Sequence, residues 1–148
     1  IGRLQKNKVK YLVGSVALIH SLDTVSAAGE IDRKARASGI KMPVLVEVNT
    51  GGESKGGVEP DALGDFLLEI SALQGVKVSG LMTMPPYFDD PEDARPYFAV
   101  LRNLRDELSA KYPDLKELSM GMSGDFEAAI EEGATIVRIG SAIFGNRA

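Results

Sequence analysis

The sequence predicts a parallel α/β fold, and three observations support this prediction. Apolar, β-branched runs of strand length alternate strictly with helical patterns along the 148 residues. Glycine or proline marks most of the junctions between them. The connections are long enough for the helical crossovers that join parallel strands. Two architectures satisfy this order: an open doubly wound sheet, and part of a (β/α)8 barrel.

Five strands and five helices are expected. The apolar runs predict strands over 16–21, 43–49, 76–84, 115–120 and 134–139. Apolar residues at helical spacing predict helices over 4–13, 24–37, 60–73, 92–111 and 124–132. A complete barrel of this type has about 250 residues, and the chain opens Ile1-Gly2-Arg3-Leu4 without an initiator Met. We therefore interpret 1–148 as a single partial barrel domain that lacks the first strands.

Composition excludes several classes of function. A net charge of −4 with interspersed charges argues against a general nucleic-acid binder. No apolar run approaches the roughly 20 residues that would cross a bilayer. With no Cys and one His, few candidates exist for a transition-metal site, and none is expected.

Two turns near the C-terminus predict an anion site at the carboxyl ends of the strands. Ser123 is expected to cap the helix over 124–132, where its hydroxyl and the N–H groups of Gly124 and Asp125 could hold a phosphate. The alternative is that Ser123 only caps the helix. Gly140-Ser141 follows the next strand and offers a second cradle of N–H groups.

Arg138 stands in an otherwise apolar strand, where it either forms an outward salt bridge or points into the site; strand alternation favours the second. His20, the sole imidazole, is expected to be structural and to make one hydrogen bond. No role is assigned to Lys55, in the glycine-rich loop 50–57. The remaining candidates share a thioether and either fill the core or form an apolar wall against a flat ring: Met82, Met84, Met120 and Met122.

Five motifs, in order along the whole chain, resemble the pyridoxal-phosphate homeostasis family (YggS/PROSC). They are IGRLQKNK (1–8), IHSLD (19–23), GLMT (80–83), LSMGMSGDFE (118–127) and VRIGSAIFG (137–145). The resemblance implies a pyridoxal 5′-phosphate (PLP) binding (β/α)8 TIM barrel of alanine racemase N-terminal type (fold type III), here lacking its first strands.

The resemblance also implies a site. Ser123, Gly140 and Ser141 would bind the cofactor phosphate, Arg138 would face the pyridine nitrogen and keep it unprotonated, and Met82 would lie beside the ring. The family's Schiff-base lysine lies before the motif that begins at Ile1. No catalytic residue is therefore assigned within this chain.

The expected function is PLP homeostasis, as a carrier or buffer rather than an enzyme. The family lacks the second domain that supplies alanine racemase with its opposing catalytic base. The rivals are a PLP-dependent amino-acid racemase and a barrel enzyme that binds a phosphorylated metabolite without PLP. The expected partners are PLP and PLP-dependent apo-enzymes, with no nucleic acid or membrane, for a cytoplasmic monomer.

Overall fold

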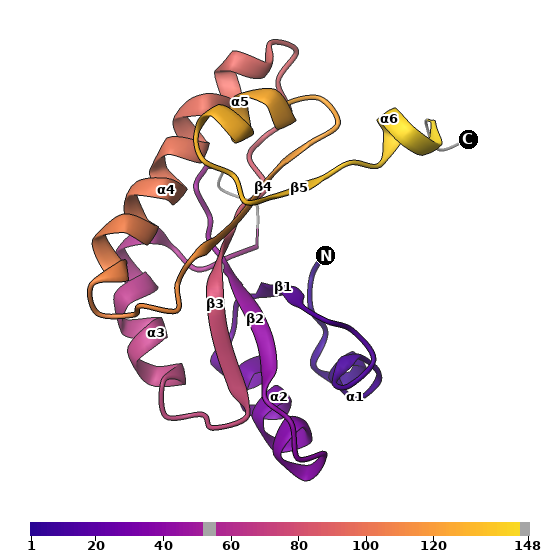
Figure 1. The fold of residues 1–148 in the computed structure, drawn as a ribbon, viewed down its shortest axis with the longest axis vertical. Coiled ribbons are helices and arrows are strands. Elements are labelled where there is room, and N and C mark those ends of the chain that lie inside the picture. The colour runs from indigo at the N-terminus through magenta and orange to yellow at the C-terminus, as the bar shows by residue number, and fades with distance from the viewer. Residues whose placement is uncertain (52–55, 146–148) are drawn as a thin grey trace.

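Five parallel strands form one row in the order of the sequence (Figure 1). We describe the protein from a computed structural model, which covers residues 1–51 and 56–145. The strands are β1 (Ile19–Leu22), β2 (Met42–Glu47), β3 (Val76–Met82), β4 (Glu117–Met122) and β5 (Ile136–Arg138). Every adjacent pair is parallel, which confirms the sequence-based prediction.

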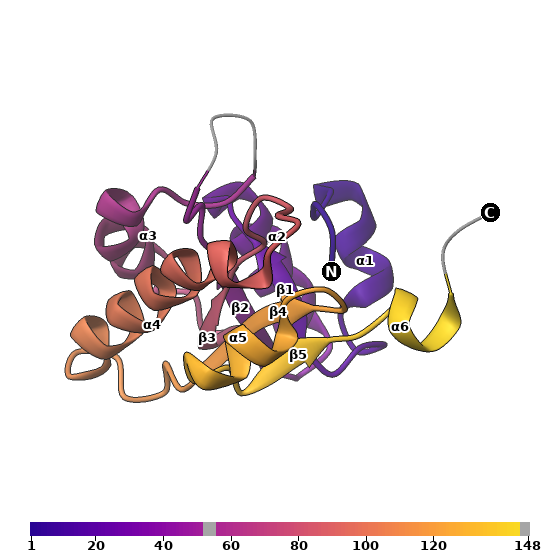
Figure 2. The same cartoon turned by 90° about the horizontal axis from the view of Figure 1, so that it is seen from above.

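The helices are α1 (Val9–Leu12), α2 (Val25–Ala37), α3 (Leu63–Ile70), α4 (Arg95–Ser109), α5 (Phe126–Glu131) and α6 (Ser141–Phe144). Helices α3 and α4 lie together on one side of the row of strands (Figures 1 and 2). Helices α2 to α5 contact the strands or one another, whereas α6 projects away from them.

Several predicted helix bounds are wrong. The helix expected over 4–13 is a 3-10 turn, Lys6–Lys8, followed by only four α-helical residues. Helices α3 and α4 each start late, after the 3-10 turns Pro60–Ala62 and Pro91–Ala94. A proline at the start of each turn fixes φ but donates no N–H, which suits a tight first turn.

The row of strands is strongly curled. His20 on β1 lies with Nδ1 2.9 Å from Ser119 Oγ on β4. In a flat sheet these strands would be separated by three inter-strand spacings, roughly 14 Å. An open doubly wound sheet would also interrupt the sequential strand order. The chain therefore forms part of a barrel, and the open-sheet alternative is wrong.

The curl separates two faces of each strand. On the convex side, Val44, Val46 and Leu118 join the apolar core beneath the helices, together with Ile31 and Phe98. Because side chains alternate along a strand, their neighbours face the concave side. This concave side includes the polar residues His20, Glu47, Ser119 and Arg138.

The glycine-rich loop predicted over 50–57 is only partly described, and Lys55 lies outside the described residues. Across 1–51 and 56–145, no helix is long and apolar enough to cross a membrane.

Candidate ligand-binding site

The two turns predicted to form an anion site lie against each other. Ser123 Oγ, just after β4, accepts hydrogen bonds from the backbone N–H groups of Gly140 (3.1 Å) and Ala142 (3.2 Å), just after β5. One hydroxyl thus joins the carboxyl ends of two neighbouring strands. The predicted proximity of these turns is confirmed.

The predicted helix cap is wrong. Helix α5 begins at Phe126, and Asp125 rather than Ser123 occupies its N-cap position. Asp125 Oδ1 accepts from the N–H of Met122 (2.6 Å), while the Asp125 N–H donates to the Met122 carbonyl (3.1 Å). This tight turn ends before the helix starts, so the Ser123 hydroxyl can reach the second turn. The turn also uses the N–H of Asp125, one of the N–H groups predicted from the sequence to hold an anion.

Glycines fix the shape of this corner. Gly121 has φ +91°, and a Cβ there would lie 2.6 Å from the Ala129 Cβ, so only glycine lets α5 approach β4 this closely. A Cβ on Gly124 or Gly140 would meet nothing within 4 Å. Open space therefore lies beside both turns, where a ligand group can approach the backbone.

Arg138 points to the concave side, as alternation predicted. Its guanidinium donates to Ser119 Oγ (2.7 Å) and to the Thr83 carbonyl (2.9 Å). Its Nε is buried and has no hydrogen-bond partner within 1–51 and 56–145. Burial lowers the pKa of Arg138, while the charges of Asp125 and Glu47 oppose the shift. One N–H is thus available to an acceptor on a ligand.

His20 has the structural role expected from the sequence. A guanidinium can only donate, so Ser119 Oγ accepts a hydrogen bond from Arg138 and can donate its own O–H to His20 Nδ1. This arrangement suits a neutral imidazole. Burial lowers the pKa of His20, and the charge of the Arg138 guanidinium adds to the effect.

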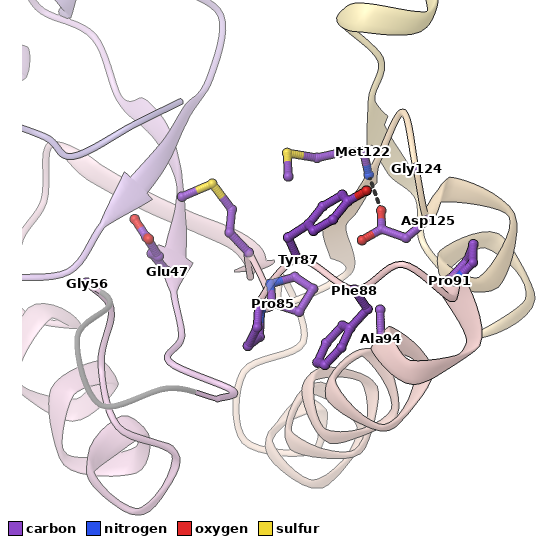
Figure 3. Close-up of a pocket in the computed structure, with 12 residues that line it drawn as sticks. Glu47, Gly56, Pro85, Tyr87, Phe88, Pro91, Ala94, Met122, Gly124 and Asp125 are labelled. Atoms are coloured by element: carbon purple, nitrogen blue, oxygen red, sulfur yellow. Dashed lines mark hydrogen bonds between the residues drawn. The ribbon is translucent and has the colours of Figure 1, made fainter.

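A cavity of about 420 Å³ opens beside the first turn (Figure 3). Its walls are mainly apolar and include Tyr87 and Phe88, and two carboxylates, Glu47 and Asp125, also line it. Of the four candidate methionines, Met84 and Met122 line the cavity. Met82 and Met120 are fully buried, and neither lines it.

Sequence reasoning missed Glu47, Ser119 and the Tyr87-Phe88 wall. A signal for Glu47 was available, since it is a lone charge in the apolar strand 43–49, as Arg138 is in 136–139. Ser119 carried no such signal. Ser119 is important because its hydroxyl, on β4, forms hydrogen bonds to His20 on β1 and to Arg138 on β5.

A curled row of parallel strands, with its polar groups gathered at their carboxyl ends, defines a parallel α/β barrel protein. The family described as alanine racemase, N-terminal domain, matches residues 2–148. A pyridoxal phosphate homeostasis protein of Aquifex aeolicus is 60% identical over 149 residues, 99% of this chain. Its Synechocystis counterpart is 37% identical over 99% of this chain and 68% of its own length.

Among solved structures, PipY of Synechococcus elongatus with PLP bound has 35% identity and a TM-score of 0.88, over 98% of this chain and 68% of that one. The chain belongs to the alanine racemase N-terminal domain family and, within it, to the pyridoxal phosphate homeostasis proteins. The resemblance predicted from the motifs is confirmed. The chain spans about 65% of the Aquifex relative.

Proposed function

We propose that the complete gene product binds PLP and serves its homeostasis as a carrier or buffer. The observation that carries this proposal is the half-buried Arg138, held by Ser119 and Thr83 beside the joined turns at Ser123 and Gly140. Its buried Nε–H has no partner among the described residues. The relatives carry the name of homeostasis proteins rather than of an enzyme. PipY is described with PLP bound.

The residues present fit this cofactor. Ser123, Gly140 and Ser141 would hold its phosphate, where open space adjoins the Gly140 backbone. Arg138 would donate its Nε–H to the pyridine nitrogen, whereas Met82, predicted to lie beside the ring, is fully buried in this structure. When bound, PLP supplies an aldehyde that reacts with amines. A guanidinium at the ring nitrogen disfavours its protonation and weakens the ring as an electron sink.

That electronic argument favours carrying PLP over demanding carbanion chemistry. We propose further that residues 1–148 correspond to the C-terminal two thirds of the family domain, and that the cofactor-bonding lysine precedes them. The recipients would be PLP-dependent apo-enzymes. A racemase is the second candidate, because alanine racemase shares the family.

The test is a PLP titration of the complete gene product, followed by gel filtration. We expect a stoichiometric change in visible absorbance and cofactor that co-elutes with the protein, while pyridoxal, which lacks the phosphate, elutes separately. If PLP is not retained, the proposal is wrong and a barrel enzyme for another phosphorylated metabolite becomes the better reading.

A second measurement separates the carrier from the racemase. The loaded protein is incubated with L-alanine in deuterium oxide, and loss of the α-proton signal is followed by NMR. We expect no exchange above that given by free PLP at the same concentration. Faster exchange would favour the racemase.

A further inference from the structure

The cavity beside the proposed cofactor site contains a carboxylate that has no partner among the residues that the structure describes. Glu47 is 6% exposed and lines the cavity (Figure 3). Its side chain makes no hydrogen bond or ion pair with any residue in the described ranges. A buried carboxylate in this state is unfavourable, because burial removes water without supplying a donor.

A second carboxylate lies close to the first. A Cβ built on Gly56, which also lines the cavity, would lie 3.5 Å from Asp23 Oδ2 and 3.8 Å from Glu47 Oε1. Burial first, and the charge of Asp23 second, raise the pKa of Glu47. Asp125 adds another carboxylate on the far side of the cavity, beyond Tyr87 (Figure 3).

The nearby cation does not compensate these charges by contact. The guanidinium of Arg138 lowers the pKa of Glu47 only as a minor influence. Its hydrogen bonds go to Ser119 and Thr83 instead. The cavity therefore combines apolar walls with an excess of negative charge, and its occupant should be a cation with an apolar body.

A metal ion fits these observations poorly. Among the described residues, no group of three His, Cys, Asp or Glu side chains is arranged to hold one. The walls contributed by Met84, Pro85, Tyr87 and Phe88 offer carbon and aromatic surface rather than oxygen ligands. An organic ammonium ion matches both the charge and the walls.

We propose that this cavity binds a primary alkylamine, with its ammonium group against Glu47 and its alkyl chain along Tyr87 and Phe88. The inference rests on the proposed function in one respect, since it names the second ligand of the PLP site. A free amino acid is disfavoured because its α-carboxylate would enter a cavity already lined by Glu47 and Asp125. An amine without a neighbouring carboxylate, as on a lysine side chain, meets no such repulsion.

The test uses the complete gene product without PLP, so that failure of PLP binding and failure of this proposal are separate results. The protein is labelled with ¹³C at the methionine methyl groups and titrated with n-butylammonium chloride or with sodium butyrate. Met84 and Met122 line the cavity, whereas Met42, at the opposite end of β2, serves as the internal control. Methionine-to-leucine variants assign the signals.

We expect butylammonium to shift the Met84 and Met122 signals in a saturable manner without moving Met42, and butyrate to shift none of them. Glu47→Gln should weaken butylammonium binding by at least about tenfold. The matched control, Glu69→Gln, removes an exposed carboxylate on α3 and should leave the affinity unchanged. The proposal is wrong if butyrate binds as well as butylammonium, a comparison that needs no variant, or if Glu47→Gln binds the amine as tightly as the wild type.

Discussion

Arg138 donates to Ser119 Oγ over 2.7 Å, and Ser119 Oγ lies 2.9 Å from His20 Nδ1. These contacts join β5, β4 and β1, so one serine hydroxyl connects the last strand of the row with the first. The connection fixes the direction of the guanidinium and with it the direction of the unpaired Nε–H. By our proposal, Ser119 would thus orient the group that meets the cofactor without contacting the cofactor itself.

Replacing Arg138 should change the state of the bound cofactor more than its retention. By our proposal, Arg138→Ala would remove the donor to the pyridine nitrogen and leave the phosphate turns at Ser123 and Gly140 unchanged. We expect a shifted visible absorbance maximum with PLP affinity within about threefold of wild type, a change of under about 1 kcal/mol. Arg33→Ala, on the exposed side of α2, is the matched control. An unaltered spectrum would contradict the placement of Arg138 at the ring.

Ser123→Ala should mainly weaken retention. The substitution removes the acceptor for the N–H groups of Gly140 and Ala142 and, by our proposal, a phosphate contact. We expect PLP affinity to fall about tenfold and the free energy of unfolding to fall by about 1 kcal/mol. Equilibrium dialysis and urea unfolding measure the two effects. The control Ser26→Ala, at an exposed position on α2, should change neither the PLP affinity nor the free energy of unfolding. If both variants lose PLP affinity equally, the assignment of Ser123 to the phosphate site is wrong.

His20 should make the protein less stable in mild acid. Burial lowers the pKa of His20 below its ordinary value of 6.5. The unfolded chain therefore takes up a proton first, and stability is lost as the pH falls from about 6.5 through the lowered pKa. His20→Gln cannot be protonated there, so its free energy of unfolding should decline less between pH 7.5 and 5.5. Parallel pH profiles for the two proteins would contradict this prediction.

Glu47 should act in the opposite direction. Because burial raises its pKa, the folded state holds the proton more tightly than the unfolded state, and stability is lost as the pH rises from the ordinary value of 4.5 through the raised pKa. Glu47→Gln should therefore be more stable than wild type at pH 7.5, with the difference vanishing near pH 4.5, the ordinary value. Thermal unfolding across this range measures it. A variant less stable than wild type at pH 7.5 would show that Glu47 is compensated in the folded protein.

Asp32 should be important for stability at a position far from the site. Its Oδ1 accepts from the buried N–H of Gly75 (2.6 Å), which joins α2 to the turn before β3. Asp32→Ala leaves that N–H without a partner and should cost about 1 to 3 kcal/mol in urea unfolding. Asp32→Asn keeps an acceptor and should cost clearly less. Equal losses in both variants would point to the charge rather than the hydrogen bond.

Much of the fold could be predicted from local pattern. The alternation of strands and helices predicted the parallel order, and the polar residue within 136–139 predicted that Arg138 faces the concave side. Local pattern gave wrong predictions where a side chain could form its hydrogen bond either with a neighbour in the sequence or with a distant residue. Ser123 looked like a helix cap, but its hydroxyl bonds to Gly140, 17 residues away. Asp125 is closer to the start of α5 and occupies the cap position instead.

The sequence alone determined the class of fold, the family, and the two turns and single arginine that compose the proposed PLP site. These depend on short-range periodicity and on motifs that stay together along the chain. Only the tertiary structure decided which side chains the curl of the strands brings together, and that Glu47 is buried with no partner among residues 1–51 and 56–145. The reason is physical, since the decisive contact joins His20 to Ser119, 99 residues apart, and the distance between such residues depends on the accumulated curl of all the strands between them.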